Sequence, residues 1–253
     1  MATVTVPSPT ARSAPKLPGY RCDHYFFSAI AALMLLTVFV GFSRTYYLVG
    51  VFHAPLPDLI IHLHGAAFTL WMLLLITQTS LVATGRTDLH RRLGIAGFAL
   101  GCVMVVLGVL AGTDLLLRQY RALDPFGRDP RAFYIVPLTD MLLFATFLLC
   151  AFGNRFDPAA HKRCMLFANT SLMVAAIARW PIGFIVRNNP VDCLVSNVFF
   201  LLLVAYDYWS TRKIHRVTLW AGAFLIFVQQ IRAPVGKTAA WHSFANWVIA
   251  QFS

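Results

Sequence analysis

Charged residues are scarce in this chain. Only 12% of its 253 residues are charged, whereas 58% are hydrophobic, and soluble domains carry about 25% charged residues. A soluble globule of this size could not hide so much apolar surface, so the composition indicates a membrane protein. Acidic residues are the scarcer sign, with 10 Asp+Glu against 21 Lys+Arg. Nucleic-acid-binding proteins show a similar balance, but here the basic residues cluster between apolar segments, which is typical of a membrane protein.

The sequence also lacks the short motifs of common enzyme classes. It contains no P-loop, no G-x-G-x-x-G and no H-E-x-x-H motif, and no carboxylates are paired at a spacing suited to hydrolysis. The five cysteines are scattered without a C-x-x-C pair, so we expect neither a disulfide framework nor a zinc finger. Catalytic residues, and whether the protein is an enzyme, stay unassigned at this stage.

Seven apolar segments are long enough to cross a membrane, since a bilayer core needs about 20 apolar residues per helix. Backbone groups in lipid must bond within their own segment, so each segment predicts a helix. The segments are residues 25–50, 59–84, 92–117, 132–153, 163–187, 191–211 and 217–233. Residues 238–252 carry aromatic side chains at helical spacing and predict a short helix in the membrane interface.

The expected fold is therefore all-α: a polytopic membrane helix bundle of seven transmembrane helices plus a short C-terminal interfacial helix. We expect one transmembrane helical domain over residues 21–253. Residues 1–20 are rich in proline and small polar residues, which predicts a flexible cytoplasmic tail.

A histidine followed by basic residues lies at the start of three of the seven segments, just before the apolar run, at residues 90–92, 161–163 and 215–216. Seven crossings would place all three motifs on the same side. That side, with the N-terminal tail, carries twelve Lys and Arg residues against seven on the other. The positive-inside rule then predicts a cytoplasmic N-terminus and an external C-terminus.

Several polar side chains fall inside the apolar segments, where such groups usually face other helices. His64, Trp71 and Gln78 follow one another at intervals of seven residues, close to two helical turns, so they share one face. His62 lies nearly opposite His64. Toward the outer side, the candidate ligand-binding residues are Arg44, His62, Asp140, Arg179, Asn197 and Gln230.

Asp140 and Arg179 are expected at a similar depth below the outer surface. Pairing them would remove most of the cost of burying each charge. Two interpretations stay open: a structural ion pair that fixes helix register, or an outward-facing cavity in which Arg179 and Arg44 bind an anionic headgroup or substrate.

The candidate cofactor-binding residues are four histidines, His64, His90, His161 and His215. At a helix N-terminus the macrodipole and neighbouring basic residues favour the neutral imidazole, which is the form that binds a metal or haem iron. The same histidines could equally cap helices or lie at the level of the lipid headgroups. Asp207, about two turns earlier than His215 along the chain, is the expected acidic neighbour of His215.

Several short motifs resemble those of a group of uncharacterised bacterial multi-span membrane proteins: FSRTYY (42–47), HLHG (62–65), Trp71, LHRRLG (89–94), HKR (161–163) and TAAWHSFANW (238–247). The resemblance covers most of residues 40–250 and implies a bacterial inner membrane, but no activity. LHRRLG is also loosely similar to a turn in a membrane family that has been compared with haem-bearing cytochrome b561 proteins. Those proteins hold histidine pairs inside facing helices at two depths, whereas His90, His161 and His215 here lie at helix mouths.

Three functions fit these observations. The first is a membrane redox protein that binds haem b or a transition metal through layered histidines. The second is a small transporter or lipid- or anion-binding protein with an outward-facing cavity. The third is a non-catalytic assembly subunit, because Gly94, Gly97 and Gly101 suit tight helix contacts. The expected partners are membrane lipids and either another membrane protein or a second copy of the chain, and no nucleic acid.

Overall fold

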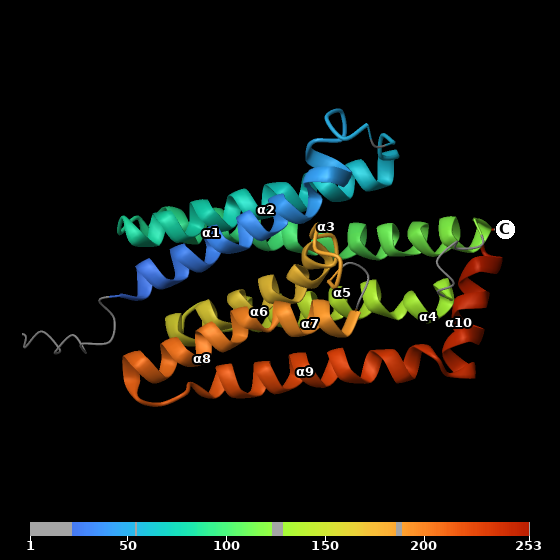
Figure 1. Ribbon diagram of the computed structural model, residues 1–253. Coiled ribbons are helices and arrows are strands. Elements are labelled where there is room, and N and C mark those ends of the chain that lie inside the picture. The colour runs from blue at the N-terminus through green and yellow to red at the C-terminus, as the bar shows by residue number, and fades with distance from the viewer. Residues whose placement is uncertain (1–21, 54, 123–128, 186–188, 253) are drawn as a thin grey trace, which may run out of the picture.

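The computed structural model describes residues 22–53, 55–122, 129–185 and 189–252, and over these ranges the chain contains helices and no strands. Long helices run side by side, and one short helix lies across an end of the bundle (Figure 1). The predicted all-α fold is confirmed. The elements are α1 (Asp23–Phe42), a π-helical turn η2 (Ser43–Tyr47), α2 (Leu59–Ala83), α3 (Thr87–Arg121), α4 (Pro130–Phe133), α5 (Ile135–Gly153), α6 (Pro158–Ile177), α7 (Asn189–Ser196), α8 (Val198–Thr211), α9 (Arg216–Gly236) and α10 (Ala239–Ala250).

Capping side chains explain where several helices begin. The Asp58 carboxylate accepts the backbone N–H of Ile61 over 3.0 Å at the start of α2. Asp157 accepts the N–H of Ala159 over 3.0 Å, directly before a proline in the first turn of α6. Such caps satisfy N–H groups that have no partner within the helix, so the polar turns set the helix starts.

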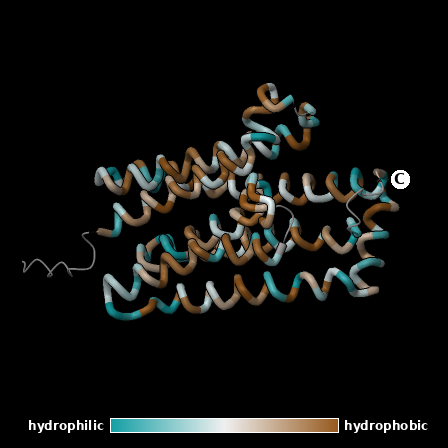
Figure 2. The backbone as a smooth tube through the Cα atoms, viewed as in Figure 1, coloured by the Kyte–Doolittle hydropathy of each residue, from teal (hydrophilic) through white to brown (hydrophobic). Residues whose placement is uncertain are grey.

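Within the described ranges, five helical segments are long and apolar enough to cross a membrane: Asp23–Tyr47, Leu59–Ala83, Thr87–Arg121, Pro130–Gly153 and Pro190–Thr211. Hydrophobic residues dominate the middle of most helices, and hydrophilic ones gather toward their ends (Figure 2). This pattern indicates a membrane protein. The other two expected crossings correspond to α6 and α9, so a total of seven stays a prediction.

The enclosed position of α6 explains why it is less apolar than a helix that faces lipid. Fourteen of its twenty residues are buried, and it packs against α1, α5, α7 and α9. Polar side chains on such a helix meet other helices rather than lipid. In α1, Gly41 lies directly against the backbone carbonyl of Ala176 near the end of α6, where a larger side chain would hold the two helices apart.

Helices α1, α2, α3, α5 and α6 form a closed ring. Successive members of the ring pack together, and α6 returns to contact α1. The glycines of α3 contribute to this ring: Gly97 faces Leu74 of α2, and Gly101 faces Leu148 of α5. These tight contacts therefore lie within one chain.

One sequence-based boundary differs from the structure. The expected segment 163–187 is helical only as far as Ile177, and Trp180 and Pro181 lie in the turns beyond it. Pro181 therefore follows the helix, as is usual for a proline just beyond a helix end. The short helix expected over residues 238–252 is confirmed as α10, whose Trp241 Nε1 donates to the backbone carbonyl of Arg131 over 2.8 Å. The predicted tail, residues 1–20, lies outside the described residues.

Helices α1, α3, α6 and α9 all begin at one end of the bundle, which we call the basic end. It comprises these helix starts and the turns at 84–86, 154–157 and 212–215, and its basic residues include Arg86, Arg155, Arg212 and Lys213. The three histidine-basic motifs meet at this end, as predicted. The side of the membrane that it faces stays a prediction.

Candidate functional site

A cavity of about 510 Å³ lies within the helix ring and opens at the basic end. Its deeper part is lined by apolar side chains that include Met34, Trp71 and Leu74. His24 and Arg91 line it close to the helix ends. The cavity is therefore amphipathic, with an apolar interior and a polar mouth.

A buried hydrogen bond fixes one wall of the cavity. Trp71 Nε1 donates to Asn169 Oδ1 over 2.9 Å, which joins α2 to α6. Trp71 and Gln78 both line the cavity, as expected for residues on one face of α2. His64 is not among the lining residues, and its ring stacks on Phe68 with the ring centres 4.1 Å apart.

Three polar atoms of lining residues are buried without a hydrogen-bond partner: Ser28 Oγ, Gln78 Oε1 and His90 Nδ1. Ser28 lies five residues into α1, Gln78 five residues before the end of α2, and His90 three residues into α3. At 1.5 Å per residue, all three lie about 5–8 Å inside the basic end. The three residues form a polar band just within the mouth. The unmatched atoms themselves lie behind the cavity surface, where each costs about 1–3 kcal/mol for as long as its side chain has no partner.

Two of the four candidate histidines lie side by side in the cavity wall. The rings of His90 and His161 have centres 6.2 Å apart and an interplanar angle of 89°. His161 Nδ1 donates to the backbone carbonyl of Ala151 over 2.9 Å, which orients the ring and leaves the Nε2 lone pair available. The sequence placed these two residues in one layer, and the structure brings them into contact range.

His215 has a capping role and lies apart from this pair. Its Nδ1 accepts the backbone N–H of Val217 over 3.2 Å at the start of α9. Its own backbone N–H donates to Asp207 Oδ2 over 3.1 Å, so the expected neighbour is confirmed. His215 is not among the residues that line the cavity.

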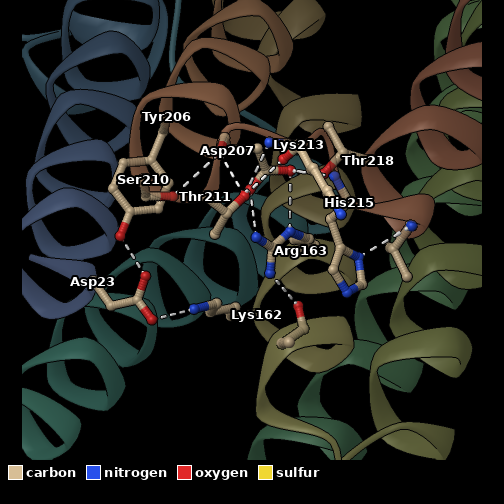
Figure 3. Close-up of polar contacts among 12 residues, drawn as sticks. Asp23, Lys162, Arg163, Tyr206, Asp207, Ser210, Thr211, Lys213, His215 and Thr218 are labelled. Atoms are coloured by element: carbon tan, nitrogen blue, oxygen red, sulfur yellow. Dashed lines mark hydrogen bonds and ion pairs between the residues drawn. The ribbon is translucent and has the colours of Figure 1, made fainter. Parts of the chain in front are cut away.

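Asp207 is the centre of a buried network beside the cavity. Its carboxylate pairs with the Arg163 guanidinium and accepts the Thr218 hydroxyl over 2.5 Å. Figure 3 shows these groups converging from α6, α8 and α9. From the sequence, Arg163 was interpreted only as one of the basic residues whose charge orients the protein in the membrane. The signal that this interpretation missed was the acidic residue inside an apolar segment, which requires a buried partner.

A second charged group lies at the mouth. Lys162 pairs with Asp23, and the same carboxylate accepts the hydroxyl of Tyr206 (Figure 3). Among the residues that the structure describes, the charged side chains that line the cavity are thus three cations, Arg91, Arg155 and Lys162, and one carboxylate, Asp23. Because Lys162 already holds the carboxylate, the mouth carries a net positive charge.

The expected pair of Asp140 and Arg179 is wrong. Asp140 accepts instead from Arg232 over 2.7 Å, and both side chains are buried. Arg179 lies beyond the end of α6, where it is exposed, donates to the carbonyl of Ala175 over 2.5 Å and covers the ring of Phe42. The reason is lateral position: α5 packs against α9 as well as α6, which brings Asp140 to Arg232, whereas the Arg179 side chain lies over Phe42 of α1.

The remaining outer candidates lie in separate contacts. Arg44 lies over the ring of Phe52, 5.4 Å from its centre, and His62 is exposed. Asn197 Nδ2 donates to Gln229 Oε1 over 3.0 Å. Gln230 is exposed, so its neighbour Gln229 is the glutamine that faces the interior.

Within the part of the chain that the structure describes, no group of three or more His, Cys, Asp or Glu residues is placed to hold a metal ion. Comparisons with protein-family models, curated proteins and solved structures gave no match. The properties of the cavity are therefore the basis for a functional proposal.

Proposed function

We propose that this protein is an integral membrane protein that binds a small amphiphilic molecule in the cavity at the basic end. The observation that carries the proposal is the band of three polar lining residues, Ser28, Gln78 and His90, inside the mouth of a largely apolar cavity, each with a buried polar atom that has no partner. A polar head at this level would give these side chains a partner to turn toward, and an apolar body would fill the space below. The volume of about 510 Å³ lies within the usual range for ligand sites, about 300–1,000 Å³.

The energetics favour a ligand that has both a polar head and an apolar body. Burial of apolar surface contributes about 25 cal/mol per Å², which the deeper wall around Met34 and Leu74 can supply. A wholly apolar ligand would leave the polar band unsatisfied, at about 1–3 kcal/mol per group. A wholly polar ligand would gain nothing from the deeper wall. The site is suited to lipid-like molecules.

The location of the protein belongs to the same proposal. We place it in the bacterial inner membrane with seven crossings, α6 and α9 included, and with the basic end in the cytoplasm. The ligand would then enter at the interface between the membrane and the cytoplasm. This corresponds to the transporter or lipid-binding hypothesis, with the cavity at the end opposite to the one expected from the sequence.

Native mass spectrometry of protein purified in mild detergent tests the proposal. We expect one bound amphiphile per chain, and we expect it to be lost in the double variant Ser28→Ala/Gln78→Leu. Thr77→Val is the matched control, because Thr77 lies beside Gln78 in α2 but is exposed and does not line the cavity. Wild-type protein without any bound amphiphile, even after incubation with a broad lipid panel, would contradict the proposal.

A redox function through haem b is the second candidate, and the His90–His161 pair favours it. Two imidazoles that share one metal, with bonds of about 2.0–2.1 Å, have ring centres roughly 6 Å apart, close to the 6.2 Å observed. Haem iron needs only one or two protein ligands, whereas a bare zinc-like ion needs three or four. The carbonyl that fixes His161 is also a common partner of metal-bound histidines.

This candidate ranks second because His90 lies only three residues into α3, which would hold the iron near the mouth and leave the deeper cavity unused. An absorption spectrum of anaerobically purified protein tests it. A Soret band that is lost in His90→Ala and in His161→Ala, but kept in His215→Asn, would establish haem binding. Colourless, folded protein that resists reconstitution with haemin would exclude it. A role as an assembly subunit stays a prediction.

A further inference from the structure

We propose that the ligand is a single-chain amphiphile with an anionic head, and that Arg91 and Arg155 bind that head. The inference rests on the proposed function, since it names the class of molecule that the cavity would take. It depends on the charges at the mouth rather than on the polar band within it.

Arg91 and Arg155 approach the mouth from two directions. Arg91 lies in the first turns of α3, and Arg155 lies in the turn between α5 and α6. Both side chains are exposed, and among the described residues neither forms an ion pair with a carboxylate. A guanidinium can donate two parallel hydrogen bonds to a carboxylate or phosphate, so both arginines are available for an anionic head.

The position of Arg155 is partly fixed. Its guanidinium donates to the backbone carbonyl of Phe152 over 3.1 Å. It also lies over the rings of Phe152 and Phe156, at 4.7 Å and 4.5 Å from their centres. These contacts hold the charge beside the cavity and leave further N–H groups of the guanidinium unused.

Asp23, the single carboxylate among the lining residues within the described ranges, disfavours a cationic head. Asp23 already pairs with Lys162 and accepts the hydroxyl of Tyr206 (Figure 3). A cationic ligand would have to displace Lys162 and would meet two unpaired arginines. The mouth therefore selects for negative charge.

The dimensions of the cavity suit one chain. Along α1 the lining extends from Asp23 to Met34, which is eleven residues or about 16 Å of helix. A space of about 510 Å³ spread over this length fits one alkyl chain better than a two-chain lipid. The shared chemistry is thus a long alkyl chain with a carboxylate or phosphate head, as in a fatty acid or a monoacylglycerol phosphate.

The test compares heads on a constant chain. Purified protein in nanodiscs of uncharged lipid is titrated with palmitate, 1-palmitoylglycerol phosphate, hexadecanol and hexadecylamine, and thermal stabilisation gives apparent affinities. We expect at least one anionic ligand to bind about tenfold or more tightly than hexadecanol, with hexadecylamine weakest. The comparison of palmitate with 1-palmitoylglycerol phosphate shows whether the site prefers a carboxylate head or a phosphate head.

Two double variants isolate the contribution of the mouth. Arg91→Gln/Arg155→Gln should weaken the anionic ligand about tenfold and leave hexadecanol unchanged. Lys213→Gln/Arg216→Gln is the matched control: it removes the same charge from exposed positions at the same end that do not line the cavity, and it should keep the preference.

The outcomes separate the inference from the proposed function. If hexadecanol or hexadecylamine binds as tightly as both anionic ligands, the anionic head is wrong while amphiphile binding stands. The same holds if the control variant weakens the anionic ligand as much as the arginine variant does. If none of the four ligands binds, the proposed function itself fails.

Discussion

The carboxylate of Asp140 and the guanidinium of Arg232 form a buried ion pair 92 residues apart in sequence, with an O–N distance of 2.7 Å. The Arg232 side chain is 0% exposed, and its second terminal nitrogen, Nη2, donates to Cys193 Sγ over 2.7 Å. The pair joins α5 to α9 in the half of the bundle away from the cavity. A charge buried this deeply depends on its partner, because either group alone would be uncompensated.

Removal of one partner should therefore destabilise the protein strongly. We expect Asp140→Asn or Arg232→Met to lower the free energy of unfolding by about 3–5 kcal/mol, and Asp140→Leu/Arg232→Met to recover most of the loss. Thermal and denaturant unfolding in detergent measure the effect. Asp114→Asn is the control, because its pair with Arg118 is partly exposed and should contribute only about 0–1 kcal/mol. Equal losses in the control and in the buried-pair variants would contradict this expectation.

Asp207 should be equally important at the basic end. Asp207→Asn weakens its bonds to Arg163 and Thr218, so we expect the turn between α8 and α9 to open more often. Hydrogen exchange over residues 208–220 should accelerate at least tenfold in the variant. Asp88→Asn, an exposed change at the same end, should leave these rates unaltered. Unchanged protection in Asp207→Asn would show that the network does not hold the turn.

His215 predicts a pH dependence of stability. Its Nδ1 lone pair accepts the Val217 N–H, which a protonated ring cannot do. The pKa of His215 is lowered, mainly by burial and further by the nearby positive charge of Arg163. The negative charges of Asp207 and Asp157 raise the pKa and offset part of this effect. The folded pKa thus lies below the unfolded value of about 6.5, so the unfolded chain binds the proton more readily. The stabilisation is present above about pH 6.5 and is lost as the pH falls below it.

Melting temperatures between pH 5 and 8 check this dependence. His215→Asn keeps a capping acceptor without titration, so its melting temperature should fall less than that of the wild type at acidic pH. His215→Ala lacks the cap at every pH and should lose about 1 kcal/mol even at pH 8. Identical profiles for the wild type and His215→Asn would mean that other groups cause the dependence.

The sequence predicted the helices well because long apolar segments have few structural alternatives in lipid. It also predicted that His90 and His161 share a level, since each directly follows a turn at the same end. The partners of the buried charged side chains were harder to predict. Depth along a helix can be counted from the sequence, but lateral position cannot. Asp140 was matched by depth to Arg179, whereas the packing of α5 on α9 brings it to Arg232.

The sequence predicted an outward-facing cavity, and it did not predict this one at the basic end, for a related reason. Its polar band combines atoms from three helices, and Ser28 has no distinctive sequence context. Gln78 was placed correctly on the inward face of α2, but the space beside it depends on how five helices close into a ring. Such a space arises from packing between helices and leaves no local pattern.

A larger side chain at Gly94 would fill the cavity and so test whether the ligand binds there. Gly94 lines the cavity, and a Cβ at this position would meet only Gln78 Nε2, at an ordinary contact distance of 3.6 Å. Gly94→Leu should therefore project into the cavity without displacing backbone, and replacement of a helical glycine should itself stabilise α3 by up to about 1 kcal/mol. We expect amphiphile binding to weaken at least tenfold while the melting temperature of the ligand-free protein is kept or raised.

Gly153→Leu is the matched control, since a Cβ there meets nothing within 4 Å and residue 153 does not line the cavity. It should bind amphiphiles as the wild type does. Ligand-dependent thermal stabilisation measures both variants side by side. Because the two substitutions are identical in chemistry and differ in position, a loss of binding confined to Gly94→Leu would locate the ligand inside the helix ring. Undiminished binding in Gly94→Leu would instead place the ligand on the lipid-facing surface.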